Sequence, residues 1–478
     1  MSERRRESAG SRLLAFLRVV PAPLHGSSAA NPSRTTPTWA RFLPSCILSR
    51  IAGRSYLQSV IGNIGWQFAD HVVRMGIGFL VGIWLARYLG PERYGLFSYV
   101  LAFTVLFFPL ATLGLDNIVV RNLVRDPTSR QLTLGTSFIL KLVGGVFSFL
   151  AATVAIFILR PADRQSQWLV AIVAAGALFQ AFNTIEVWFN SQVQAKYPVL
   201  ARNAAFLVCA LVKIALILAG ASLFAFAWVG LLEVVAGAAG LVLVYRLQGQ
   251  RLRQWASSLK MAGELLKDSW PLLFSGFVVV GYMRIDQVML GEMVGSKAVG
   301  VYTVAVRLAE VWFFFATAVY WSVLPSLVEA KAASEALFYQ RLQKYYNLTA
   351  LAGYAIAIPV TLLADRLVLA LFGAPYAEAG PMLAILIWAT MFVYLETARS
   401  AFFNVMNLYR LYFATLALGA AVNVCLNLVL IPRYGGLGAA IASCVSYWFA
   451  AHGACFLFRP LRRTGVMLAR AMVFPKIW

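Results

Sequence analysis

Apolar runs of about twenty residues, separated by short polar segments, recur along the chain from about residue 60 to residue 458. A helix rising 1.5 Å per residue needs about twenty residues to cross roughly 30 Å of hydrocarbon. The pattern therefore predicts an all-α polytopic membrane protein of about twelve spans. We place them near residues 62–85, 94–113, 133–159, 168–189, 203–223, 225–245, 270–291, 299–324, 346–372, 381–402, 412–431 and 436–458.

The composition supports this interpretation. Of the 478 residues, 61% are hydrophobic and 13% charged, whereas soluble domains are about half apolar and one quarter charged. The chain carries no HExxH, Walker, GxGxxG, GxSxG or DxD motif and no long loop between spans, which argues against an enzyme. Its five cysteines form no CxxC pair and its three histidines suggest no zinc site. We expect no metal and no cofactor, apart from H⁺ or Na⁺ as a coupling ion.

The net charge of +22 would suggest nucleic acid in a soluble protein. Here the placement of the basic residues points to membrane topology instead. Of those assigned to tails and connectors, 28 lie in the two tails and in the connectors on the same side of the membrane. The other side holds only seven, namely Arg87, Arg93, Arg160, Arg164, Lys297, Arg366 and Arg433. Cytoplasmic connectors hold the excess of Lys and Arg, so both termini are expected in the cytoplasm, and nucleic acid is not expected as a partner.

The chain divides into two six-span lobes. We expect a basic, disordered tail at 1–58, an N-lobe at 59–245, a linker at 246–269, a C-lobe at 270–458 and a second basic tail at 459–478. Apolar residues of the linker, such as Leu252, Trp255 and Leu259, are three or four apart, which predicts an interfacial helix. The segments 90–97 and 295–302 both read G-x4-G-x-aromatic and open the second and eighth spans. This repeat indicates two halves that run in the same sense.

We single out twelve ionisable residues inside the predicted spans. Six are basic, namely Arg74, Lys141, Lys213, Arg284, Arg307 and Arg399, and six are acidic, namely Asp70, Glu186, Glu233, Asp286, Glu310 and Glu396. Each costs about 2.5–3.5 kcal/mol near the bilayer centre, so these side chains should face the bundle interior or a hydrated cavity. One interpretation is a central cationic cavity that accepts an anionic substrate such as a phosphate. The other is that the charges only neutralise one another.

Helical spacing suggests partners for some of these charges. Asp70 and Arg74 are four residues apart, and the pairs Arg307/Glu310 and Glu396/Arg399 are three apart, so each pair can meet on one helix face. Lys141 and Lys213 have no acid at such a spacing. They need a carboxylate from another helix, such as Glu186 or Glu233, or a visiting anion.

Two segments carry a family resemblance. Residues 86–99 read ARYLGPERYGLFSY and are followed by LGLD at 113–116 and by Arg121. Residues 423–430 run into IPRYG at 431–435 and GAA at 438–440. With these motifs, and over nearly everything after residue 58, the chain resembles the oligosaccharide flippases of bacterial polysaccharide synthesis, of the O-antigen type.

The resemblance implies a fold shared with multidrug and toxin extrusion transporters and lipid II flippases, in which two six-helix lobes alternate around a central cavity. It also implies a multi-pass protein of the bacterial plasma (inner) membrane that carries an oligosaccharide on undecaprenyl pyrophosphate. Membrane lipids, a polysaccharide polymerase and chain-length proteins are the implied partners. We expect the six basic residues to line the cavity for the pyrophosphate, because arginine donates to phosphates in bidentate fashion. The six acidic residues are then charge partners or coupling groups.

Two alternatives remain open. A multidrug antiporter of the same fold should favour acidic and aromatic residues in its cavity. A membrane glycan polymerase should carry a large periplasmic loop. Lipid II flippases are expected to have fourteen spans rather than twelve, so the peptidoglycan interpretation is weaker.

Overall fold

The computed structural model describes residues 55–476, with side chains from residue 65 onward except residues 68 and 69. The predicted N-terminal tail up to residue 54 lies outside the described residues. All the regular elements of the described part are helices, with α for α-helices and η for 3-10 helices. They are α3 (Ser55–Val105), α4 (Phe108–Thr112), α5 (Asp116–Arg125), η2 (Pro127–Ser129), α6 (Arg130–Leu159), α7 (Arg164–Ala174), η3 (Ala175–Phe182), α8 (Asn183–Ser191), α9 (Lys196–Leu218), α10 (Leu223–Leu247), η4 (Leu252–Gln254), α11 (Leu259–Met293), α12 (Ser296–Glu310), α13 (Phe313–Ala333), α14 (Glu335–Phe372), η5 (Ala374–Tyr376), α15 (Ala379–Met406), α16 (Tyr409–Tyr434), α17 (Gly436–Ala451), η6 (Gly453–Phe456), η7 (Arg459–Leu461) and α18 (Arg462–Val473).

Eleven helical segments of the described part are long and apolar enough to cross a membrane. The first of them, Gly65–Val105, is interrupted at Gly90, whose φ of 71° and ψ of 171° are not helical. Pro91 follows, and a proline has no backbone N–H with which to continue the ladder of helical hydrogen bonds. The interruption separates the first predicted span from the second. The prediction of an all-α membrane protein with about twelve spans is therefore confirmed.

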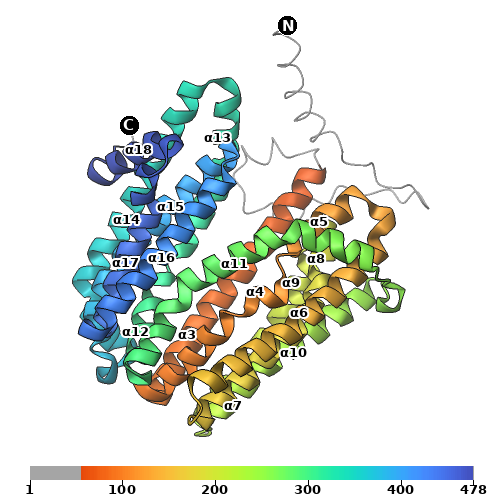
Figure 1. Cartoon of the computed structure of the whole chain (residues 1–478), viewed down its shortest axis with the longest axis horizontal. Helices are drawn as coiled ribbons and strands as arrows, with labels where there is room; N and C mark the ends of the chain where they lie inside the picture. Colours follow the sequence, from red (N-terminus) through yellow and green to blue (C-terminus); the bar gives the residue numbers. More distant parts are fainter. Residues whose placement is uncertain (1–54, 477–478) are drawn as a thin grey trace. The chain divides into compact units, whose positions relative to one another are not determined.

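Helices from the two halves of the chain pack mainly within their own half, and α11 contacts both. Helix α10 packs against α9 and η3, whereas α14 packs against α15, and α16 against α17. Helix α11 contacts α4, α5 and α6 of the first half as well as α12, α16 and α17 of the second. Figure 1 shows α11, in green, running between these two groups of helices.

The linker differs from the single interfacial helix expected over 246–269. Only the end of α10, η4 and the start of α11 are helical there, and the backbone at Trp255 and Ser258 is extended. The extended segment follows the beginning of α6, where the Ala256 N–H donates to the Gln131 carbonyl at 3.2 Å. The Trp255 indole also donates to the Tyr245 hydroxyl at 3.0 Å. These contacts hold the segment against the first half of the chain, so Trp255 packs on protein, whereas Leu259 is 94% exposed at the start of α11.

The two G-x4-G segments of the repeat, 90–95 and 295–300, pack directly against each other; we call them the paired glycine motifs. Gly90 and Gly295 both have a positive φ, of 71° and 117°, and each is followed by a helical segment. A Cβ added at Gly95 would overlap with the carbonyl oxygen of Ser296, and one added at Gly300 would overlap with that of Pro91. The sixth residue of each motif therefore contacts the second residue of the other. This reciprocity is the contact expected between two repeats related by a local two-fold axis.

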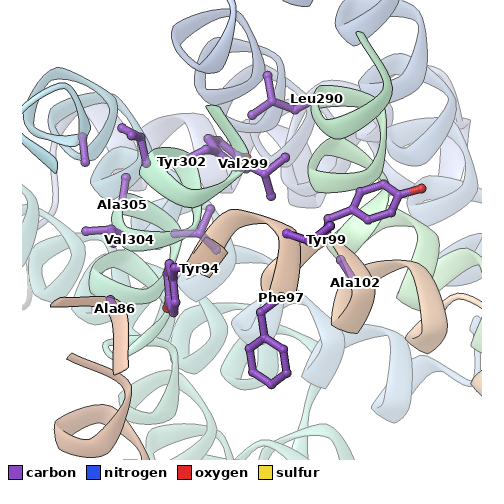
Figure 2. Close-up of a cluster of buried hydrophobic side chains, with 14 of the residues drawn as sticks. Ala86, Tyr94, Phe97, Tyr99, Ala102, Leu290, Val299, Tyr302, Val304 and Ala305 are labelled. Carbon is purple, nitrogen blue, oxygen red and sulfur yellow. The ribbon is translucent and has the colours of Figure 1, made fainter. Parts of the chain in front are cut away.

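A buried cluster surrounds the paired glycine motifs and joins the two halves. Figure 2 shows residues of α3, α11 and α12 in this cluster, among them Tyr94, Tyr99, Leu290, Val299 and Val304. The Tyr99 ring and the Val299 side chain both lie against Gly291, where an added Cβ would overlap with the ring and lie 3.3 Å from Val299. The connector after α14 also takes part, since the Tyr376 hydroxyl donates to the Ala86 carbonyl at 2.7 Å.

Candidate functional site

A cavity of about 430 Å³ lies where α3, α11 and α12 meet, and we call it the junction cavity. Helix α3 belongs to the first half of the chain and α12 to the second, so both halves contribute to it. Its polar lining consists of Ser98, Arg284, Gln287, Thr303, Arg307 and Glu310. Three of these six, Arg284, Arg307 and Glu310, are among the charged residues predicted from the sequence.

Arg307 is the cation of the junction cavity that forms no ion pair with the part of the chain described by the structure. Its guanidinium lies against α3, with Cζ 5.5 Å from the centre of the Tyr94 ring. Close approach is possible because Gly82 has no side chain: a Cβ there would overlap with Nη1 of Arg307. The expected pair with Glu310 is not formed, because Glu310 pairs with Arg284 instead, and no other carboxylate of the described residues bridges Arg307.

Arg284 and Glu310 form a two-point ion pair across α11 and α12. Nη1 of Arg284 lies 3.2 Å from Oε1 of Glu310, and Nη2 donates to Oε2 at 3.4 Å. The side chains retain 31% and 25% of their exposure, so the pair borders the cavity and is not sealed in the core. With this pair neutralised, Arg307 leaves the lining with one net positive charge. The charge of the lining is therefore complementary to that of a negatively charged group.

Asp286 lies on the other side of α11, buried against α12 and α17. Its carboxylate accepts hydrogen bonds from the Tyr302 hydroxyl, from the Ser443 hydroxyl at 2.9 Å and from the Gln287 N–H at 2.9 Å. All three donors are neutral, and no ion pair is formed with a described residue. Asp286 is thus a buried carboxylate beside the junction cavity, where it can hold a proton or a cation.

Three further ion pairs surround a smaller pocket of about 130 Å³ in the first half, which we call the N-half pocket. Arg74, Arg202 and Glu233 line it. Asp70 accepts from Arg74 Nε at 2.9 Å, Glu186 from Arg202 at 2.6 Å, and Glu233 from Lys213 at 2.8 Å. The predicted pair Asp70/Arg74 is therefore present in the structure, and Lys213 pairs with Glu233, one of the two carboxylates suggested for it. Arg202 was not among the candidates because the sequence placed it in a connector, just before the fifth predicted span.

Lys141 is buried in α6, with 1% of its side chain exposed, and its ion-pair partner is Asp116. Neither of the partners suggested from the sequence, Glu186 and Glu233, meets it. Asp116 is the first residue of α5, so it comes from a separate helix and no spacing rule connects it with Lys141. The resemblance motif LGLD contains this aspartate, which was the one signal in the sequence that marked it.

Arg399 is completely buried in α15, away from the junction cavity and the N-half pocket. Its Nη1 donates to the Cys455 sulfur at 3.0 Å and its Nη2 to the Thr415 hydroxyl at 3.2 Å. The expected pair with Glu396 is not formed, because Glu396 accepts from the Tyr412 hydroxyl at 3.0 Å. In this structure Arg399 therefore ties α15 to α16 and η6.

A charged network outside the spans holds the two halves together near the paired glycine motifs. Arg160 contacts Glu292 of α11 at 3.0 Å and Asp163 at 3.5 Å, and its Cζ lies 4.1 Å from the centre of the Tyr99 ring. Burial raises the pKa of Asp163, but hydrogen bonds from Ser166 and the charge of Arg160 outweigh it, so this pKa is lower than that of an ordinary aspartate. Asp163 therefore stays ionised near neutral pH and keeps Arg160 in place.

Comparison with known proteins identifies relatives among membrane proteins. A family model described as polysaccharide biosynthesis protein matches residues 60–331. An uncharacterized membrane protein of Methanocaldococcus jannaschii is 24% identical over 426 residues, covering 82% of this chain and 83% of that protein. The probable flippase AglR of Haloferax volcanii is 25% identical over 173 residues, which is 35% of this chain and 36% of AglR.

Solved structures with the same fold are transporters. An inward-facing multidrug resistance MATE family transporter of the MOP superfamily superposes with a TM-score of 0.67 at 17% identity, covering 86% of this chain and 99% of that one. The lipid II flippase MurJ, in an inward closed conformation, gives a TM-score of 0.64 at 12% identity, covering 86% and 91%. These matches establish the two-lobe fold that the sequence predicted.

Proposed function

Because the chain belongs to the family of polysaccharide biosynthesis proteins, we propose that it is a flippase for lipid-linked oligosaccharide. It moves an oligosaccharide on undecaprenyl pyrophosphate from the cytoplasmic to the outer leaflet of a bacterial plasma membrane, for surface polysaccharide synthesis. Both termini lie in the cytoplasm, and the protein acts together with a polysaccharide polymerase and chain-length proteins. The likeness to the fold of a lipid II flippase and the partial match to a probable flippase support this proposal.

The observation that carries the proposal is the guanidinium of Arg307 in the junction cavity, which forms no ion pair with any described residue. A pyrophosphate is a strong acceptor, and charge-assisted hydrogen bonds to arginine are shorter and stronger than neutral ones. Arg307 offers its donors without first breaking an ion pair, whereas Arg284 must leave Glu310 to do the same. We assign Arg307 as the primary hydrogen-bond donor to the phosphate. Arg284 is a second donor, which binds the cargo after leaving Glu310.

The remaining predicted residues take supporting roles in this proposal. Arg74, Lys213 and their partners Asp70 and Glu233 surround the N-half pocket, where a coupling H⁺ or Na⁺ can exchange with the ion pairs. Asp286 is a second candidate coupling group because its partners are neutral. Glu186, Glu396, Lys141 and Arg399 are held by other residues in this structure, so they act in another conformation or only stabilise the fold.

The test is transport of a labelled cargo by the purified protein in liposomes. A fluorescent undecaprenyl-pyrophosphate oligosaccharide is incorporated, and dithionite added outside reports how much of it reaches the outer leaflet. We expect the Arg307→Gln variant to lose about ten- to hundredfold in rate, the equivalent of one or two charged hydrogen bonds. Arg410→Gln is the matched control, because Arg410 is exposed at the start of α16 and lines none of the described cavities.

Equal rates for the wild type and the Arg307→Gln variant would contradict the proposal. A multidrug antiporter of the same fold is distinguished by ethidium efflux, which we expect to be absent. The net positive lining of the junction cavity disfavours cationic drugs on electrostatic grounds. A polymerase is distinguished by longer glycan products, which we do not expect in the liposome assay.

A further inference from the structure

The C-terminal helix α18 lies outside the predicted spans and is fixed to α14. Figure 1 shows it, in dark blue, across the end of the helices of the second half. The Gln343 amide donates to the Met467 carbonyl at 3.0 Å, and the Tyr354 hydroxyl donates to the Met472 carbonyl at 2.7 Å. The position of α18 on α14 is therefore set by hydrogen bonds as well as by packing.

A groove of about 850 Å³ runs between α14 and α18, and we call it the C-terminal groove. Four cationic residues line it, namely Lys344, Arg463, Arg470 and Lys476, together with Gln340 and Phe474. None of the described residues that line it is an aspartate or a glutamate. Arg463 has an exposed acidic neighbour, Glu335, at 3.6 Å, whereas the other three cations form no ion pair with any residue from 55 to 476.

The length of α14 places this groove at the level of the lipid headgroups. The helix has 38 residues, but about twenty suffice to cross the hydrocarbon. Its apolar part occupies the C-terminal two thirds, and the groove is formed by its first, polar turns. The C-terminal groove therefore lies beyond the hydrocarbon, where phosphate groups of lipids are found.

Helix α18 presents an apolar surface next to the cationic groove. Leu468 and Ala471 are buried against the protein, whereas Val466, Val473 and Phe474 are 60%, 66% and 65% exposed. A helix with basic residues and an exposed apolar face is typical of elements that lie in the membrane interface. The groove and this face together offer donors for a phosphate and an apolar surface for the chains attached to it.

We propose that the C-terminal groove binds the headgroup of an anionic phospholipid, with its acyl chains along Val466 and Val473. Basic pockets between helices at the headgroup level select anionic lipids by charge, and the groove has four cations with a single exposed counter-ion beside it. The bound lipid adds contacts between α14 and α18 and stabilises the second half of the protein. This site is separate from the junction cavity and does not depend on the identity of the transported cargo.

Titration of the detergent-purified full chain with phosphatidylglycerol or phosphatidylcholine, followed by native mass spectrometry, tests the proposal. The wild type should retain phosphatidylglycerol preferentially. The triple variant Lys344→Gln, Arg470→Gln, Lys476→Gln should bind it at least about tenfold more weakly, because three of the four cations are removed. The matched control is Arg251→Gln, Arg253→Gln, Lys260→Gln, which removes the same charge from exposed linker positions and should stay within about twofold of the wild type.

A second measurement on the unmodified chain does not require the variant to fold. Hydrogen exchange in residues 462–474 should slow when phosphatidylglycerol is added and should not change with phosphatidylcholine. Equal lipid affinity of the groove variant and the wild type would overturn the proposal. So would equal binding of the two lipids, or the same protection of α18 by inorganic phosphate alone, since the site would then not be a lipid site.

Discussion

Gly95 of α3 and Gly300 of α12 each pack on the backbone of the other's helix. Gly95 lies against the Ser296 carbonyl and Gly300 against the Pro91 carbonyl. Backbone atoms cannot rotate away as a side chain can, so the contact tolerates no Cβ at either position. The contact also lies beside the Arg160–Glu292 and Tyr376–Ala86 interactions, which join the same two halves.

The Gly300→Val substitution should separate α3 from α12. The new side chain would overlap with the Pro91 carbonyl, so the two helices must move apart. We expect the backbone amides of residues 91–99 to exchange at least about tenfold faster, a loss of roughly 1.4 kcal/mol of protection. Hydrogen–deuterium exchange with mass spectrometry measures this.

The control for this prediction is Gly230→Val in α10, where a Cβ would meet no atom within 4 Å. It should leave the exchange of residues 91–99 unchanged. Unaltered exchange in the Gly300→Val protein would show that the paired glycine motifs do not hold the halves together.

The Lys141–Asp116 pair should contribute more to stability than a surface pair does. The Asp116→Asn variant leaves the buried Lys141 without a counter-ion, which we expect to destabilise the protein by about 2–4 kcal/mol, because one partner is buried and the other half exposed. Thermal or denaturant unfolding in detergent measures the change. In the pair Arg121–Asp268 both side chains are about half exposed, so Asp268→Asn should cost about 1 kcal/mol or less.

Adding Lys141→Met to the Asp116→Asn variant should restore most of the lost stability, since the uncompensated charge is then gone. If the double variant is as unstable as the single one, burial of the unpaired ammonium is not the cause of the loss.

The Arg284–Glu310 pair should show coupling in a double-mutant cycle. Arg284→Gln and Glu310→Gln each leave a partly buried partner unpaired, whereas the double variant leaves none. We expect a coupling energy of about 1–3 kcal/mol in unfolding experiments. In the transport assay Glu310→Gln should keep measurable activity, because it frees Arg284 for the cargo, and a complete loss would argue against that role.

Arg399 should matter for folding more than for transport. Arg399→Lys keeps the charge but cannot reach both Cys455 and Thr415, so we expect about 1–3 kcal/mol of destabilisation. The loosened packing should also let a maleimide label Cys455, which is fully buried in the wild type. The outcome that would contradict this is a loss of transport per folded molecule as large as that of the Arg307→Gln variant. Arg399 would then line the cavity in another conformation of the protein.

The sequence predicted those features that depend on local pattern. Apolar runs of span length gave the helices, and the G-x4-G repeat marked the two segments that meet. Spacing of four residues on one helix correctly paired Asp70 with Arg74. Where partners come from different helices, as with Lys141 and Asp116, the sequence held no rule that could connect them.

Pairs three residues apart were predicted less well. Glu310 is the last residue of α12, and its carboxylate reaches Arg284 on the neighbouring α11. Glu396 likewise bonds to Tyr412 of α16. In both cases a partner on a packed helix competes with the residue on the same helix, and only the tertiary structure decides between them. The same holds for Trp255 of the linker, which packs against Phe138 of α6 and Tyr245 of α10.

Helix α11 crosses from one half of the protein to the other without a break. Near its middle, Gly276 contacts Pro109 of the first half: a Cβ added at Gly276 would be 3.3 Å from the proline ring. Ten residues later, Asp286 is bonded to Ser443 of the second half. A rocking motion that keeps both of these contacts must bend the helix over the roughly 15 Å between them. Gly281 lies inside that segment, and a Cβ added there would meet no atom within 4 Å. Helix α11 can therefore bend at Gly281 without displacing a neighbouring residue.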